Sequence, residues 1–287
     1  MRPDENEPPE PHEPAPNAED PGVTPAGPPP GIFERSNNYL LLVYAGACLL
    51  MDYSLAALLY IEGMVSLSLS LPGILAIIIP FFLLAQRSAL GFSRQFSLGR
   101  ITPGAGALAL LVSAAAILPV DAFSTIFERM WAPDADYISF ILSIKPKGPV
   151  SFFFVAIGIV GVAAIAEELL FRGFIQRIFQ RNMNGALAVV LAGLIFALCH
   201  FNLPALPGVA ALGVLYGYLF YRTGALWYSI IGHGVYNLVT LLRLNAATEE
   251  EIVSTSVTSP DLGWTLVSLG VLLASLALLA RIHPKRQ

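Results

Sequence analysis

Long apolar stretches follow one another from Tyr39 towards the end of the chain, separated by short polar turns. A membrane-spanning helix needs about 20 apolar residues, and all but one of the stretches come close to that length. Their apolar positions are continuous rather than alternating, which is typical of helices and not of membrane strands. The pattern predicts an all-α, polytopic membrane helix bundle with about eight transmembrane helices, near 39–61, 63–85, 104–124, 150–176, 185–203, 207–221, 225–243 and 262–281. Because the stretch 207–221 is short, seven helices is the alternative.

The first 36 residues have a different pattern. They are rich in Pro, Glu, Asp and Ala and contain no apolar run. Such a segment cannot bury enough apolar surface to offset the entropy lost on ordering. It also lacks the basic and apolar regions of a signal peptide. We therefore predict a disordered, acidic, Pro-rich tail over residues 1–36 and a transmembrane bundle over residues 37–287.

The composition supports lipid as the main solvent. Hydrophobic residues make up 55% of the chain and charged residues 13%, compared with about 25% charged residues in a soluble domain. Seven of the twenty acidic residues lie in the first twenty positions, so the net charge of −4 says little about partners. No basic patch of the kind that binds nucleic acid is present. Cys48 and Cys199 lie in apolar stretches and indicate neither a disulfide nor a thiolate metal site.

The placement of Lys and Arg predicts the orientation, because cytosolic loops carry the excess of positive charge. With eight spans, both termini share one side of the membrane. That side holds Arg35, Arg87, Arg94, Arg100, Arg177, Arg181, Arg222, Arg281, Lys285 and Arg286. The other side holds Arg129, Lys145, Lys147 and Arg243, together with the acidic run Glu249–Glu251. We predict an integral membrane protein, in the plasma membrane, with both termini in the cytosol.

Charged groups inside a bilayer usually mark function, and the predicted helix 150–176 holds three of them. Glu168 precedes Arg172 by four residues, which is the favourable order for an ion pair along a helix. Glu167 lies about 100° around the helix from Glu168 and has no such local partner. An unpaired carboxylate suits a general base or acid. The alternative is that both glutamates pair with Arg172 and only hold helices together.

Two histidines, His200 and His233, also fall in predicted membrane helices. At about 1.5 Å per residue, Glu167 and His200 each lie about 23 Å from the turn between their helices. His233 lies about 13 Å from the turn at Gly224, and about 10 Å of the first hairpin is expected to project into the cytosol. All three side chains therefore come to about the same depth. One histidine alone would be explained by an interhelical hydrogen bond, but three groups at one depth favour a site.

Two further residues accompany these histidines. Asn237 follows His233 by four residues and shares its helix face. Phe196 precedes His200 by the same spacing and could shield the imidazole. By contrast, Asp52 and Asp121 are expected near helix ends, facing water. The pair Gly213 and Gly217 matches a small-residue motif for helix packing and is expected to be structural.

A glutamate, two histidines and an asparagine can hydrolyse an amide in two ways. In a metal-free scheme, Glu167 takes a proton from water with the help of His200, while His233 and Asn237 donate hydrogen bonds to the oxyanion. In the alternative scheme, Glu167, His200 and His233 hold a zinc ion that activates the water. The familiar H-E-x-x-H zinc motif is absent, and Asn is a better oxyanion donor than zinc ligand. We favour the metal-free scheme and assign no cofactor, with zinc as the alternative.

Three short motifs carry a family resemblance. Residues 167–172 match E-E-x-x-x-R, residues 196–200 match F-x-x-x-H, and residues 233–237 match H-x-x-x-N. Together and in this order they resemble the CPBP family, which comprises CAAX proteases and bacteriocin-processing enzymes and is also called the Abi family. The matching core spans residues 150–243.

The resemblance implies an eight-helix intramembrane endopeptidase whose site opens towards the cytosol. It implies Glu167 as the catalytic base with His200 beside it, and His233 and Asn237 as the oxyanion site. Glu168, Arg172 and Phe196 are supporting residues. The expected partners are the lipid bilayer and a membrane-associated protein or peptide substrate, and no nucleic acid. The competing hypothesis is a non-enzymatic membrane scaffold or bacteriocin-immunity protein.

Overall fold

The computed structural model describes residues 31–88, 90–131, 133–254 and 259–281, without the side chain of Arg35. All regular elements in these ranges are helices, so the predicted all-α membrane helix bundle is confirmed. The helices up to residue 144 are α1 (Ile32–Arg35), α2 (Asn38–Ile61), α3 (Val65–Ser68), the π-helix η1 (Gly73–Ile78), α4 (Ile79–Gln86), α5 (Gly91–Gln95), α6 (Pro103–Met130) and α7 (Ala135–Ile144). The later ones are α8 (Pro149–Ala156), η2 (Ile157–Ala163), α9 (Ala164–Leu170), η3 (Phe171–Gln176), α10 (Arg177–Asn182), α11 (Gly185–Leu198), α12 (Leu206–Thr223), α13 (Leu226–Ala246), α14 (Glu249–Val253) and α15 (Leu262–Leu279).

Five helical stretches of the described chain are long and apolar enough to cross a membrane. They are Asn38–Ile61, Val65–Gln86, Pro103–Met130, Pro149–Asn182 and Leu262–Leu279. The other three predicted spans correspond to α11, which is shorter, and to α12 and α13, which include more polar residues. The total of eight transmembrane helices therefore stays a prediction.

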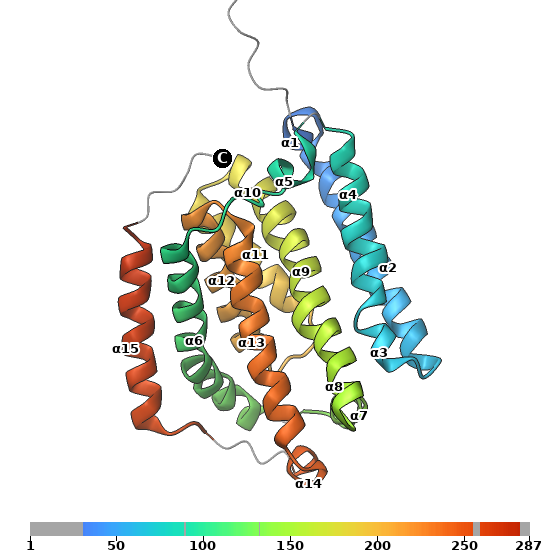
Figure 1. Cartoon of the computed structure of the whole chain (residues 1–287), viewed down its shortest axis with the longest axis vertical. Coiled ribbons are helices and arrows are strands. Elements are labelled where there is room, and N and C mark those ends of the chain that lie inside the picture. Colours follow the sequence, from blue (N-terminus) through green and yellow to red (C-terminus); the bar gives the residue numbers. More distant parts are fainter. Residues whose placement is uncertain (1–30, 89, 132, 255–258, 282–287) are drawn as a thin grey trace, which may run out of the picture.

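The helices run alternately up and down the bundle (Figure 1). Helices α2 and α4 lie on one side and α6 and α15 on the other, with α9, α11, α12 and α13 between them. Helices α1, α5 and α10 and the end of α15 lie at one end of the bundle, and α7 and α14 lie at the opposite end. The two termini of the described chain thus lie at the same end of the bundle. An even number of membrane crossings would place them in this way.

Residues 1–30 of the tail predicted for residues 1–36 lie outside the described residues. Its last part differs from the expectation, because Ile32–Arg35 forms α1. Phe33 is buried, with its ring centroid 5.5 Å from that of Phe174 in η3. Gln95 accepts a hydrogen bond from the backbone N–H of Ile32 at 3.0 Å. One buried aromatic residue therefore attaches this segment to the bundle, although its surroundings in the sequence are polar.

One continuous helical stretch, Pro149–Asn182, includes two π-helical segments, η2 and η3, on either side of α9. A π-helical turn frees or shifts backbone hydrogen-bonding groups and is frequent at functional sites. The intervening α9 is only seven residues long and includes both Glu167 and Glu168. The local helical geometry therefore changes immediately before and after the two carboxylates.

Helix α11 ends at Leu198, earlier than the predicted limit of residue 203. Its last backbone bonds tighten into i→i−3 pairs from the N–H groups of His200 and Phe201. Phe201 then adopts a left-handed conformation, with φ of 49°. His200 thus lies in a turn between α11 and α12 and not in a helix, and the turn lies level with the middle of the long helix that includes Glu167.

Small residues bring α11 and α12 close together. A Cβ atom on Gly213 would lie 2.7 Å from the carbonyl oxygen of Gly193, and one on Gly193 would lie 2.7 Å from the backbone nitrogen of Val214. A Cβ atom on Gly217 would lie 2.7 Å from the side-chain oxygen of Gln176 and 3.2 Å from the side chain of Val189. The motif at Gly213 and Gly217 therefore has the packing role expected of it.

Candidate active site

The carboxylate of Glu167 faces both membrane histidines. Its Oε2 atom lies 3.8 Å from Nε2 of His233 and 4.0 Å from Nε2 of His200. The same oxygen is buried and has no hydrogen-bond partner among the described residues. The side chain of Glu167 is nevertheless 28% exposed. Three groups from α9, the α11–α12 turn and α13 thus meet around one oxygen atom that is left without a partner, as the depth estimates predicted.

The backbone sets the tautomer of His200. Its Nδ1 atom lies 2.8 Å from the carbonyl oxygen of Phe196. A carbonyl can only accept a hydrogen bond, so Nδ1 must carry a proton. In the neutral imidazole, Nε2 then has a free lone pair. This lone pair faces Glu167 and can accept a hydrogen bond from a water molecule between the two side chains.

Glu168 and Arg172 form the expected i,i+4 ion pair, with 2.8 Å between Oε1 and Nη1. Both side chains are fully buried. Arg172 also donates through Nη2 to the carbonyl of Gly213 at 2.8 Å. Oε1 of Glu168 lies 2.9 Å from Nδ1 of His233. Of the two glutamates, only Glu168 pairs with Arg172, so Glu167 is left for another role.

Two aromatic rings enclose the histidines. Phe196 has its ring centroid 4.7 Å from that of His200 and 5.8 Å from that of His233. Tyr216 stacks on His233 with centroids 5.4 Å apart and ring planes inclined by 14°. The guanidinium of Arg172 lies over the Phe196 ring at 4.5 Å. The expected shielding by Phe196 is present, whereas Tyr216 was not singled out from the sequence because nothing in its spacing connects it to His233.

Asn237 lies one turn after His233, but its described contact is with η2. Its Nδ2 atom donates to the carbonyl of Ile159 at 2.9 Å. Gly234, on the same helix, brings the backbone of α13 near Val160, since an added Cβ would lie 3.3 Å from the Val160 carbonyl oxygen. The structure therefore brings Glu167, His200 and His233 together directly and places Asn237 beside them, attached to η2.

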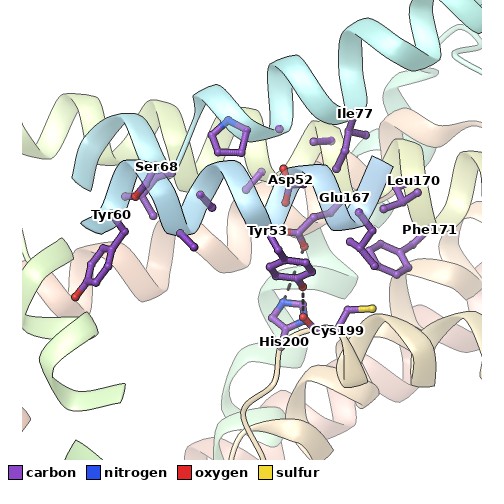
Figure 2. Close-up of a pocket in the computed structure, with 18 of the residues that line it drawn as sticks. Asp52, Tyr53, Tyr60, Ser68, Ile77, Glu167, Leu170, Phe171, Cys199 and His200 are labelled. Carbon is purple, nitrogen blue, oxygen red and sulfur yellow. Dashed lines mark hydrogen bonds and ion pairs between the residues drawn. The ribbon is translucent and has the colours of Figure 1, made fainter. Parts of the chain in front are cut away.

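A cavity of about 400 Å³ opens beside these residues, within the range typical of ligand pockets. Figure 2 shows Glu167 and His200 in its wall, together with Asp52 and Tyr53 from α2. The rest of the lining is mainly apolar: Leu49, Ala56, Ala57, Leu69, Pro72, Ile77, Phe140, Ala163, Ala166, Leu170 and Phe171 are among its members. The cavity therefore joins the candidate site to helices that come far earlier in the sequence.

The expectation that Asp52 and Asp121 lie near helix ends is wrong. Asp52 lies in the middle of α2 and lines the cavity. Helix α6 continues to Met130, so Asp121 lies well inside it and forms an ion pair with Arg243 of α13. Tyr236 also donates to Asp121 at 3.3 Å. An isolated acidic residue in an apolar stretch was the available signal for Asp52, but only the packing of α2 against α9 and the α11–α12 turn shows where it points.

The zinc alternative requires Glu167, His200 and His233 to share one ion. Ligand atoms at about 2.0–2.1 Å from a tetrahedral zinc lie about 3.4 Å apart. The separations of 3.8 and 4.0 Å from Glu167 Oε2 are wider. Within the described ranges, no group of three or more His, Cys, Asp or Glu residues is arranged to hold a metal ion. The donor set as placed does not fit zinc.

Comparison with known proteins gives one family. Residues 149–239 match the family model described as Rce1-like, type II CAAX prenyl endopeptidase Rce1-like. The match confirms the family recognised from the three motifs and contains all of them. No curated protein and no solved structure matches the chain. Together with the five apolar helices, the match supports an integral membrane protein whose residues 149–239 are similar to CAAX proteases.

Proposed function

We propose that this membrane protein with a CAAX-protease core is an intramembrane endopeptidase. Its substrates would be membrane-associated proteins or peptides. The observation that carries the proposal is the convergence of Glu167, His200 and His233 around an unpartnered carboxylate oxygen at the edge of a cavity. A structural carboxylate at this depth would be paired, as Glu168 is with Arg172, because an unpaired polar group in a membrane interior is unfavourable.

In the proposed reaction, Glu167 acts as the general base. A water molecule between Glu167 and His200 donates one hydrogen bond to the carboxylate and the other to the free Nε2 lone pair of His200. Glu167 takes a proton as the water oxygen bonds to the carbonyl carbon of the scissile peptide. The C–N bond then breaks, and the protonated Glu167 returns the proton to the leaving nitrogen. Atoms and charges balance without a further reactant.

His233 and Asn237 are proposed to stabilise the oxyanion of the tetrahedral intermediate. Nδ1 of His233 already donates to Glu168, so donation from Nε2 requires the doubly protonated ring. The carboxylate of Glu168 is well placed to stabilise that cation. Asn237 gives one N–H to Ile159 and has a second on the same nitrogen. A rotation of its side chain would be enough to direct that N–H towards the oxyanion.

The substrate class and orientation follow from the surroundings of the site. The apolar lining of the cavity suits a hydrophobic segment or an attached lipid, and the description of the matched family refers to prenylated CAAX substrates. The basic end of the bundle, with α5 and α10, would lie in the cytosol by the positive-inside rule. We propose the plasma membrane as its location, with both termini cytosolic.

The proposal is tested with purified protein and a library of membrane-tethered peptides that contains matched pairs with and without an isoprenyl group on cysteine. Wild type is compared with Glu167→Gln and with the control Glu62→Gln, which removes an exposed carboxylate at the end of α2. We expect wild type and Glu62→Gln to cleave, and Glu167→Gln to lose activity by about 10²–10⁴-fold, the usual contribution of a general base.

Each enzyme is also assayed with and without a strong chelator. Cleavage that survives the chelator supports the metal-free scheme, while loss that zinc restores would replace it with the zinc alternative. If wild type cleaves no peptide and Glu167→Gln unfolds in detergent, the polar cluster is structural. The non-enzymatic scaffold or immunity hypothesis would then take its place.

A further inference from the structure

His200 lies in the turn that connects α11 and α12. The turn follows the last residue of α11, where an α-helix leaves its final carbonyl groups without backbone partners. Phe201 adopts a left-handed backbone conformation there, with φ of 49°, which is uncommon for a bulky residue. At membrane depth, irregular backbone persists only where protein or a cavity satisfies its polar groups. The turn therefore needs a partner from another helix.

Tyr53 of α2 supplies this partner. Its hydroxyl donates a hydrogen bond to the carbonyl of Cys199, the residue immediately before His200. Its ring meets the ring of Phe201, the residue immediately after, with centroids 5.4 Å apart in an edge-on arrangement. Figure 2 shows Tyr53 directly beside Cys199 and His200. One side chain thus contacts the chain on both sides of the histidine.

The contact of Tyr53 with the turn affects the distance between Nε2 of His200 and the carboxylate of Glu167, on which the proposed reaction depends. His200 reaches Glu167 only across a 4.0 Å gap, and its other ring nitrogen is bound to the Phe196 carbonyl at the end of the same helix. A shift of the turn would move Nε2 relative to Glu167 without breaking any contact of His233. Misplacement by about 1 Å can reduce a rate by about 10²-fold.

We infer that Tyr53 is a positioning residue: it holds the turn so that Nε2 of His200 stays at the right distance from Glu167. The expected effect of Tyr53 on catalysis rests on the proposed function. Its expected effect on the position of the turn does not. It also makes α2 part of the functional site, although α2 ends well before the matched segment begins at residue 149. Tyr53 does not touch the reacting atoms in this proposal and acts through His200.

The test compares Tyr53→Phe with Tyr39→Phe. Tyr39 comes from the same helix, but it is exposed and does not line the cavity. Each variant therefore loses one hydroxyl from α2, and only Tyr53→Phe loses a contact with the turn. We expect Tyr53→Phe to lower kcat by about 10- to 100-fold, because misplacement of a reacting group by up to about 1 Å can cost about 10²-fold, with KM within about twofold of wild type. Tyr39→Phe should match wild type in both.

A second measurement does not depend on turnover. In a Cys48→Ala background, Cys199 is the remaining cysteine and lines the cavity. Its rate of alkylation by a small maleimide reports how freely the turn moves. We expect a several-fold faster rate in Tyr53→Phe and no change in Tyr39→Phe. Thermal unfolding in detergent shows whether both variants remain folded.

Three outcomes would overturn the inference. One is a kcat for Tyr53→Phe equal to that of wild type. Another is a change in KM alone, which would make the hydroxyl a substrate contact. The last is an unchanged alkylation rate of Cys199. If wild type cleaves no substrate, the proposed function fails, and the alkylation rate still decides whether Tyr53 holds the turn.

Discussion

At the scale of single residues, the site contains one paired and one unpaired carboxylate. Glu168 is fully buried and shares its Oε1 atom between Arg172 and His233. Glu167, its neighbour in the sequence, has an oxygen without a hydrogen-bond partner in the described part of the chain, and this oxygen faces the two histidines at 3.8 and 4.0 Å. The difference follows from the 100° step between consecutive helical residues, which turns one side chain into the protein core and the other towards the cavity. Adjacent residues of one type thus have different surroundings, and the proposed function assigns a structural role to Glu168 and a chemical role to Glu167.

The buried ion pair predicts a large loss of stability when one partner is removed. Arg172→Ala leaves the Glu168 carboxylate buried without its counter-charge, which is expected to cost about 3–5 kcal/mol. Arg243→Ala is the control, because Arg243 is 51% exposed in its pair with Asp121, and exposed pairs contribute about 0–1 kcal/mol. Thermal unfolding of both variants in the same detergent measures the difference. Equal shifts of the unfolding temperature would contradict the importance of the buried pair.

At the scale of elements, the hairpin of α11 and α12 sets the position of His200. The close approach of these helices depends on Gly193 and Gly213, which leave no room for a side chain between the two backbones. The carbonyls of Gly213 and Gly217 also accept hydrogen bonds from Arg172 and Gln176, which are one turn apart on η3. The helix pair is therefore joined to the long helical stretch Pro149–Asn182 by polar bonds as well as by packing.

The packing predicts that one added methyl group will disturb the site. Gly213→Ala places a Cβ 2.7 Å from the Gly193 carbonyl oxygen, and overpacking of this kind costs about 1–3 kcal/mol. The matched control is Gly270→Ala in α15, where an added Cβ meets nothing within 4 Å. We expect lower stability and lower peptidase activity for Gly213→Ala alone. Activity of Gly213→Ala at the wild-type level would show that the hairpin does not position His200.

At the scale of the whole molecule, charge is distributed unevenly between the two ends of the bundle. The described residues at the end formed by α5 and α10 include Arg94, Arg177 and Arg181. The opposite end has the acidic helix α14, which begins with a capping box between Thr248 and Glu251. Hydrogen bonds from the backbone and hydroxyl of Thr248 lower the pKa of Glu251, so this carboxylate is ionised at neutral pH. Such asymmetry favours the basic end in the cytosol.

The orientation predicts which sites a membrane-impermeant maleimide reaches in intact cells. Single cysteines are placed at Ser93 in α5 and at Glu250 in α14, in a background with Cys48→Ala and Cys199→Ala. We expect Glu250→Cys to be labelled in intact cells and Ser93→Cys only after permeabilisation. The reverse result would mean the opposite orientation. Labelling of both in intact cells would mean that the two ends do not lie on opposite sides of the membrane.

The sequence by itself determined the features that depend on periodicity and spacing. Continuous apolar runs predicted the helical membrane bundle, because lipid offers backbone groups no partner outside a helix. The i,i+4 spacing predicted the Glu168–Arg172 pair, and counting residues from the turns predicted that Glu167, His200 and His233 lie at one depth. These results rest on the regular rise and rotation of a helix, which the amino-acid order alone specifies.

Only the tertiary structure decided what depends on neighbours distant in the chain. It ended α11 at Leu198, attached α1 to the bundle through Phe33, and stacked Tyr216 on His233. It also brought Asp52 and Tyr53 of α2 to the cavity of a site more than 100 residues later. No periodicity encodes these contacts, because they follow from how separate helices pack, and packing depends on the shapes of both partners together.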